Sequence, residues 1–284
     1  MQQIALTVLL IVTMLAIGMG TKISDFAALR QHKSSLLLAI LLNLLVVPVL
    51  TWWFLSMLPL EQPVVLGLLL CMLSPGGVAG PLFTLKAKGD VAVATLTMIL
   101  LSLLSVMSAP LTLALIVGTK KTLAGSFGLF GSMFSTLVLY LLLPLAVGLL
   151  IQRHRPLFAA RYSKPMNQIA NLLLLLVVVG LLLAKFGVFL RVGWLGLGCC
   201  VFLILLNLVI GMLTSSKPLL RRSFAMVAGI RNVPFALLIS AFYFTDPLTD
   251  ASALAYGFLM MAMTYLVALL WGRYPEKQES LAAA

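Results

Sequence analysis

Long, unbroken apolar stretches limit what this chain can fold into. Runs of about twenty apolar residues, the length of one helical membrane span, recur along the 284 residues, of which 62% are apolar and 9% charged. Soluble domains carry about 25% charged residues, so a water-soluble fold is excluded. The runs lack the alternation of apolar and polar positions that marks the strands of a membrane β-barrel. We therefore predict an all-α polytopic membrane protein.

The spacing of these runs predicts nine transmembrane helices joined by short connectors. Nine spans use roughly 180 residues at roughly 20 each, which leaves no room for a soluble domain. The whole chain, 1–284, is thus expected to form a single transmembrane domain with a tail at 272–284. The spans are expected at residues 4–20, 35–58, 64–85, 91–118, 127–151, 166–186, 194–213, 223–244 and 251–271.

The net charge of +12 follows from the connectors and indicates no nucleic-acid partner. Fourteen Lys and Arg fall in the tail and in the connectors after odd-numbered spans, whereas four fall in the connectors on the opposite side. Cytoplasmic loops collect Lys and Arg in membrane proteins. We therefore expect a multi-pass protein of the cell membrane with its N-terminus outside and its C-terminus in the cytoplasm.

Two of the expected spans contain strings that break a helix. Span 64–85 contains Ser-Pro-Gly-Gly-Val-Ala-Gly-Pro at 74–81, and span 223–244 contains Gly-Ile-Arg-Asn-Val-Pro at 229–234. Proline removes a backbone donor, and glycine lowers the cost of unwinding. Each break lies in the next-to-last span of its half if the chain divides into inverted repeats at about 1–118 and 127–271. Interrupted helices in matching positions point to a transporter site; the alternative is a pair of proline kinks, as expected at Pro48, Pro110 and Pro144.

Arg231 is the one charged residue that the expected boundaries place well inside a span. A central arginine costs about 2.5–3.5 kcal/mol on insertion scales, so it needs a partner or a role. It follows Ser223 by eight residues, which corresponds to roughly 12 Å of helix. Two interpretations stay open: a side chain that reaches the cytoplasmic edge or pairs with freed carbonyls, and a fixed cation beside a substrate path.

Other chemistry-bearing residues lie away from the expected membrane interior. All seven carboxylates and both histidines fall in connectors or the tail, which disfavours a carboxylate proton relay. Cys71, Cys199 and Cys200 have neither disulfide nor zinc spacing and are interpreted as buried small apolar residues. No Ser–His–Asp, metal-binding or Walker pattern is present, so we expect neither an enzyme nor an ATP-driven pump, and no cofactor or metal.

The sequence resembles the bile acid:sodium symporter family over nearly the whole chain, and the resemblance is strongest at the breaks. The match rests on Ser74-Pro75-Gly76-Gly77, Ala87-Lys88-Gly89-Asp90, the span at 91–110, Gly18-Met19-Gly20 with Asp25-Phe26 as the first shared loop, and Gly229-Ile230-Arg231-Asn232. The resemblance implies an inverted-repeat transporter with a core domain and a panel domain, in which two broken helices cross in the core. Relatives often have ten spans, and this chain looks like the form that lacks the first.

The departures from the family pattern concern sodium. Relatives bind two sodium ions near the crossing through polar side chains. Here Gly80-Pro81 replaces a Ser-Asn pair, Ala94 and Met98 replace hydroxyl residues, and Val227 and Arg231 replace the Glu and Gln of the Glu-x-Gly-x-Gln-Asn motif. Asn43 is expected to retain the amide of a supporting helix. Hard cations need several oxygen ligands, so the resemblance argues against sodium coupling.

The resulting hypothesis gives Arg231 the electrostatic role of the missing sodium. Its guanidinium would bond carbonyls freed by the breaks and hold the crossed half-helices together, while half-helix N-termini face an anionic substrate. Family analogy allows bile salts, keto acids or pantothenate-like acids.

The predicted function is alternating-access transport of a small organic anion in the lipid bilayer. The alternatives are a sodium-coupled symporter with altered ion ligands, a channel and a non-transporting membrane sensor. An arsenite permease, which is a related type of carrier, is a weaker alternative that rests on Cys71 alone. The expected substrate-binding residues are Gly76, Gly77, Gly80, Pro81, Arg231, Asn232, Asn43, Thr97 and Thr264.

Overall fold

The described part of the chain folds into helices joined by short connectors. A computed structural model describes residues 2–22, 26, 31–118, 123–184 and 186–273. Predictions for Asp25 and for the tail beyond Arg273 lie outside these residues. The helices are α1 (Gln2–Gly20), α2 (Lys33–Leu41), the π-helical turn η2 (Leu42–Val46), α3 (Val47–Ser56), α4 (Gln62–Met72), α5 (Gly80–Lys86), α6 (Val91–Gly118), α7 (Leu123–Leu137), the π-helical turn η3 (Val138–Leu142), α8 (Leu143–His154), α9 (Pro156–Ala184), α10 (Phe186–Leu190), α11 (Gly193–Met212), α12 (Pro218–Gly229), α13 (Val233–Tyr243) and α14 (Pro247–Arg273).

Helix length and apolarity identify a multi-pass membrane protein. Within the described residues, six helices are long and apolar enough to cross a membrane: Gln2–Gly20, Lys33–Ser56, Val91–Ile116, Phe127–His154, Gly193–Met212 and Pro247–Arg273. The expected spans 64–85 and 223–244 are each divided into two short helices, α4 with α5 and α12 with α13. The polytopic all-α prediction is therefore confirmed, while the count of nine spans and the inverted repeat stay predictions.

Several helices begin earlier than the sequence analysis placed them. α9, α12 and α14 begin at Pro156, Pro218 and Pro247, because proline suits the first helical position, where its missing N–H costs nothing. As a result Asp250 lies in the first turn of α14 and Arg222 lies in α12, and both are buried. The prediction that every carboxylate lies in a connector or the tail was therefore wrong for Asp250. The prediction that Arg231 is the one charged residue well inside a span stays a prediction.

Two of the prolines follow π-helical turns. η2 ends two residues before Pro48, and η3 ends two residues before Pro144. A proline cannot donate to the carbonyl one turn earlier, and a wider turn is a known way to accommodate such a disruption. Asn43 lies in η2 and is buried.

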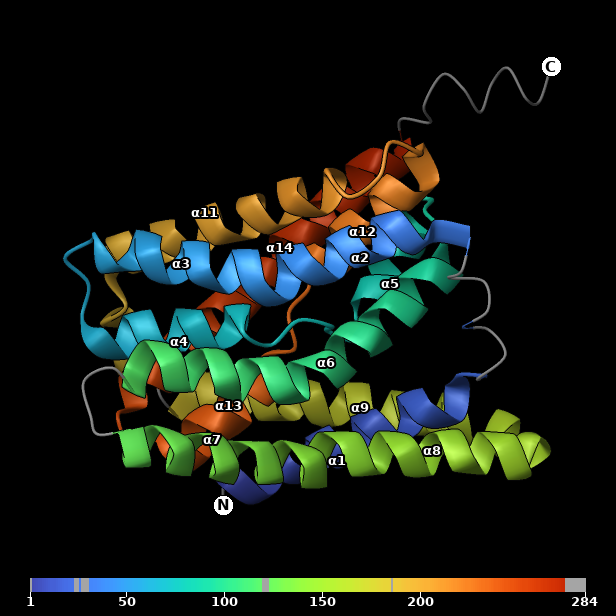
Figure 1. The fold of residues 1–284 in the computed structure, drawn as a ribbon, viewed down its shortest axis with the longest axis horizontal. Coiled ribbons are helices and arrows are strands. Elements are labelled where there is room, and N and C mark those ends of the chain that lie inside the picture. The colour runs from blue at the N-terminus through green and yellow to red at the C-terminus, as the bar shows by residue number, and fades with distance from the viewer. Residues whose placement is uncertain (1, 23–25, 27–30, 119–122, 185, 274–284) are drawn as a thin grey trace.

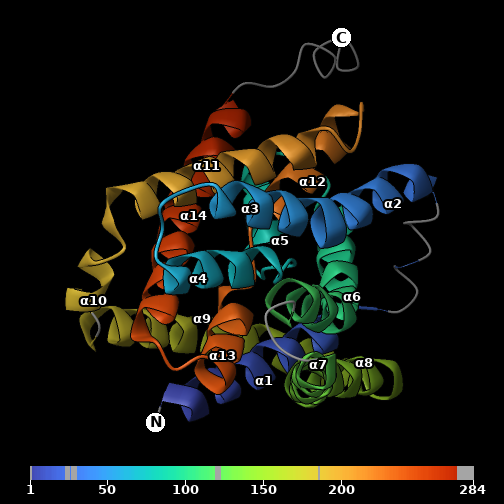
Figure 2. The same cartoon turned by 60° about the vertical axis from the view of Figure 1, so that its left-hand side comes forward.

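The helices form two packed groups (Figures 1 and 2). α1, α7, α8 and α9 lie along one side of the molecule, and we call them the α1 layer; α1 packs on α8 and α9. The second group, which we call the crossing bundle, contains the broken helices together with α6, α11 and α14. In both views α11 lies on the side of this bundle away from the α1 layer.

A pair of glycines brings α1 and α8 into backbone contact. A Cβ on Gly148 would lie 2.9 Å from the Gly18 Cα, closer than real Cβ atoms approach. Small residues let membrane helices pack this closely. Gly18 is thus a packing residue inside α1, not part of the loop that the resemblance implied.

We expect Gly148→Ala to destabilise the protein by about 1–3 kcal/mol, the usual cost of overpacking. The added methyl group must push α1 away from α8. Thermal unfolding of the purified protein in detergent measures the change. Gly131→Ala in α7 is the matched control, since a Cβ there meets nothing within 4 Å and should leave stability unchanged or slightly raised. Equal melting temperatures for the two variants would contradict the close contact.

Candidate functional site at the helix crossing

The two breaks lie side by side and pair through their backbones. Asn232 donates its N–H to the Ser74 carbonyl at 2.7 Å, and Gly77 donates to the Ile230 carbonyl at 3.1 Å. Pro75 and Arg231 thereby form an isolated antiparallel bridge. The pairing brings four helix ends together, those of α4, α5, α12 and α13, and satisfies backbone groups that the breaks expose.

Two glycines are required where the segments cross. Gly76 has a φ of +84°, and a Cβ on it would lie 2.6 Å from the Met98 carbonyl oxygen of α6. A Cβ on Gly77 would lie 2.6 Å from Ile230 Cγ2, so no side chain fits between the paired segments. Ser102 of α6 donates its hydroxyl to the Gly76 carbonyl at 3.1 Å.

The Arg231 side chain is buried at the crossing, with 2% of the residue exposed. Its Nη1 donates to the Met72 carbonyl at 3.5 Å, and its Nη2 donates to Asn207 Oδ1 of α11. Met72 is the last residue of α4, so its carbonyl is one of those that have no hydrogen-bond partner within the helix. Arg231 thus links the second break to the helix end at the first.

The guanidinium is surrounded by uncharged groups. In the part of the chain that the structure describes, no carboxylate lies within ion-pair distance of Arg231, and its Nε has no hydrogen-bond partner. The backbone N–H of Arg231 donates to Met260 Sδ at 3.0 Å, and Tyr256 of α14 lies close to the guanidinium. The positive charge at the crossing therefore has only neutral hydrogen-bond acceptors.

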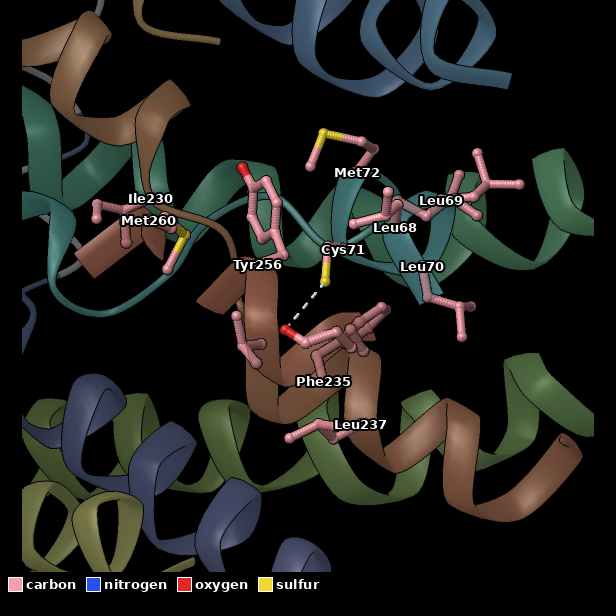
Figure 3. Close-up of a cluster of buried hydrophobic side chains, with 14 of the residues drawn as sticks. Leu68, Leu69, Leu70, Cys71, Met72, Ile230, Phe235, Leu237, Tyr256 and Met260 are labelled. Atoms are coloured by element: carbon pink, nitrogen blue, oxygen red, sulfur yellow. Dashed lines mark hydrogen bonds between the residues drawn. The ribbon is translucent and has the colours of Figure 1, made fainter. Parts of the chain in front are cut away.

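A cluster of buried apolar side chains extends to the crossing, where it includes Ile230 (Figure 3). Met72, Tyr256 and Met260 belong to one buried cluster with Cys71, whose thiol lies 3.8 Å from the Ala253 carbonyl. All three cysteines are buried, as expected for small apolar residues. Met260 also takes part in a polar contact, because its sulfur accepts the Arg231 N–H.

The structure brings together the candidate residues on the two breaks. Gly76 and Gly77 lie on the first crossing segment, while Gly80 begins α5 next to Pro81 and would place a Cβ 3.4 Å from Val227 Cα of α12. Asn232 caps α13 by accepting the Phe235 N–H at 3.3 Å.

The remaining candidates are less closely tied to the crossing. Thr264 lies beside the end of α12, with its methyl group 3.4 Å from a Cβ built on Gly229. The buried Thr97 and Thr264 hydroxyls have no partner among the described residues, so neither bonds its own helix there. Asn43 donates to the Ala39 carbonyl at 2.8 Å. A role for Asn43 and Thr97 in the site stays a prediction.

Sequence reasoning missed Asn207, Ser102 and Tyr256. Asn207 is the one amide in the span 194–213, and a lone amide in an apolar span is a visible signal. Ser102 carries no such signal, because Ser and Thr recur in these spans and commonly bond their own helix. Nothing in the sequence distinguishes Tyr256 from the other tyrosines.

We expect Gly77→Ala to lower the melting temperature of the protein markedly, because a methyl group cannot enter the paired segments without separating them. The loss should reach at least the 1–3 kcal/mol typical of overpacking. Gly80→Ala is the matched control, because its Cβ would meet only ordinary contacts of 3.4 Å or more. Thermal unfolding of both purified variants makes the comparison, and an equally stable Gly77→Ala protein would contradict the pairing.

Comparison with known proteins identifies the family. The sequence model of the Sodium Bile acid symporter family matches residues 7–192, which include the first break and end before the second. No curated protein matches the chain. The family match agrees with the buried crossing and the apolar helices, and members of this family are membrane transporters and not enzymes. The chain therefore belongs to the sodium bile acid symporter family.

Proposed function

We propose that this protein is a secondary transporter of an organic anion that works by alternating access and without sodium coupling. The observation that carries the proposal is the buried Arg231 guanidinium, whose hydrogen-bond acceptors at the crossing are uncharged. A fixed positive charge in an apolar interior favours an anion and disfavours a second cation. At 5 Å and an effective dielectric of about 20, two unit charges interact by about 3 kcal/mol.

Arg231 takes over the charge that sodium supplies in relatives. It also braces the crossing, since one side chain joins the Ile230–Asn232 segment to the end of α4 through the Met72 carbonyl. One of its Nη groups reaches Asn207 on α11, and α11 lies on the side of the crossing bundle away from the α1 layer (Figure 1). We therefore propose that Arg231 attracts the substrate through its field. The groups that contact the substrate are those on the crossing segments, with Asn232 at the start of α13 and Thr264 as the polar ones.

We propose that the α1 layer is the panel and the crossing bundle is the core, which move against each other during transport. Three side-chain hydrogen bonds join them near the start of α1. Gln2 Nε2 donates to Asp250 at 2.9 Å, Gln3 Nε2 donates to the Ala241 carbonyl at 2.6 Å, and the hydroxyls of Thr136 and Tyr243 lie 2.7 Å apart. If the N-terminus lies outside, as the charge distribution predicts, these contacts would close the outer side of the protein, and we propose that they do so.

A flux assay in proteoliposomes tests the coupling. We expect saturable uptake of at least one of taurocholate, pyruvate and pantothenate, with an equal rate when choline replaces sodium. Arg231→Gln, which restores the residue type that the family motif carries, should lower uptake about 10-fold or more because the fixed charge is lost.

The other outcomes of this assay distinguish the alternatives. Uptake that choline abolishes identifies a sodium-coupled symporter. Flux that does not saturate identifies a channel, and ligand binding without flux identifies a sensor. Uptake that is indifferent to substrate charge contradicts the anion specificity.

Cross-linking tests the proposed motion. In a variant carrying Gln3→Cys and Ala241→Cys, a short bifunctional thiol reagent should stop uptake, because it holds the α1 layer and the crossing bundle together at one end. A reductant that cleaves the linker should restore uptake. Gln3→Cys alone, treated in the same way, is the control. Full uptake by the cross-linked double variant would contradict a motion that separates these contacts.

A further inference from the structure

Asn207 is a buried amide that reaches the crossing from a third helix. It lies on α11, which packs against α12 and α14, and the residue is 0% exposed. Buried polar groups on a membrane helix are costly unless they are hydrogen-bonded. Asn207 is fully engaged: its Nδ2 donates to the Leu203 carbonyl at 2.7 Å and to Met72 Sδ at 3.2 Å, and its Oδ1 accepts from Arg231.

These bonds fix which end of the amide faces the guanidinium. The Leu203 carbonyl accepts hydrogen bonds only, so it holds the NH₂ group of Asn207 on its own side. The oxygen is then the atom that is left to meet Arg231. If the amide were flipped, its NH₂ group would face the N–H donors of Arg231. The hydrogen bond to the Leu203 carbonyl within α11 would also be lost.

The three residues Asn207, Met72 and Arg231 form a closed set of contacts. Met72 takes part twice, through its carbonyl to Arg231 and through its sulfur to Asn207. α4, α11 and the second crossing segment are thereby joined around one guanidinium. Both Nη groups of Arg231 are held, and both acceptors are neutral.

Neutrality is what distinguishes an amide from a carboxylate at this position. Aspartate has nearly the shape of asparagine and would also accept the Arg231 hydrogen bond, but it would cancel the charge. A buried charge is usually paired, so a neutral partner for this arginine leaves the crossing positive.

We propose that Asn207 is a positioning residue that orients the Arg231 guanidinium while leaving its charge uncompensated, and that this choice of amide over carboxylate sets the site's preference for anions. The second part of this inference, the preference for anions, rests on the proposed function. The first part, the coupling between Asn207 and Arg231, concerns the fold and is measured without any substrate.

A double-mutant cycle on thermal unfolding tests the coupling. Asn207→Leu removes the acceptor with little change in volume, and Arg231→Met removes the charge. We expect each to lower the melting temperature by about 4–8 °C. The double variant should lose no more than the more severe single variant, because the two residues act as one unit. Losses that add would overturn the positioning role. If Asn207→Leu does not fold, Asn207→Ser replaces it in the same cycle.

Asn207→Asp tests the charge. It keeps an acceptor for Arg231 and adds one negative charge, but it loses the amide hydrogen bonds to the Leu203 carbonyl and to Met72 Sδ. Because the new ion pair offsets part of this loss, we expect its melting temperature to lie above that of Asn207→Leu. The half-saturation concentration for uptake of the anion that the unaltered protein transports should rise about 10-fold or more. An unchanged half-saturation concentration would overturn the charge role. If the unaltered protein takes up none of the anions, the proposed function fails and the charge role with it, whereas the unfolding cycle still decides the positioning role.

Discussion

The pairing of the two crossing segments is the interaction on which the rest of the structure depends. A lipid bilayer offers no water to satisfy broken helix ends, and each unsatisfied backbone group there costs several kcal/mol. The main-chain bonds between Ser74 and Asn232 and between Gly77 and Ile230 meet part of this need. The side chains of Ser102 and Arg231 satisfy two further backbone groups by donating hydrogen bonds to the carbonyls of Gly76 and Met72, respectively. Two helices can therefore stop in the protein interior with several of their freed backbone groups hydrogen-bonded.

The same constraint explains the position of the buried charge. A guanidinium carries five N–H donors in a planar fork, so it can serve carbonyls that a broken helix releases. Arg231 sits where such an acceptor is available, with Asn207 on the opposite Nη. A longer-range consequence is that the crossing carries positive charge in a bundle whose other nearby side chains are mostly apolar, such as Met72 and Met260.

Much of the fold was predictable because helix breaks and apolar runs are local properties. The breaks at 74–81 and 229–234 were located from proline and glycine alone. Helix starts at Pro156, Pro218 and Pro247 were missed because the expected spans were bounded by their apolar runs, whereas proline suits the first turn of a helix that begins before the apolar run. The site was half predictable: Arg231 stood out by its charge, whereas Asn207 became significant only through a tertiary contact that joins residues 24 apart in the chain.

Because the two segments pair through main-chain atoms, the hydrogen bonds between their backbones do not require a particular side chain at position 231. A change of side chain at this position therefore alters the charge of the crossing while the backbone bonds between Ser74 and Asn232 and between Gly77 and Ile230 can stay in place. The electrostatics of the crossing and its main-chain architecture are in this sense separable properties of the chain.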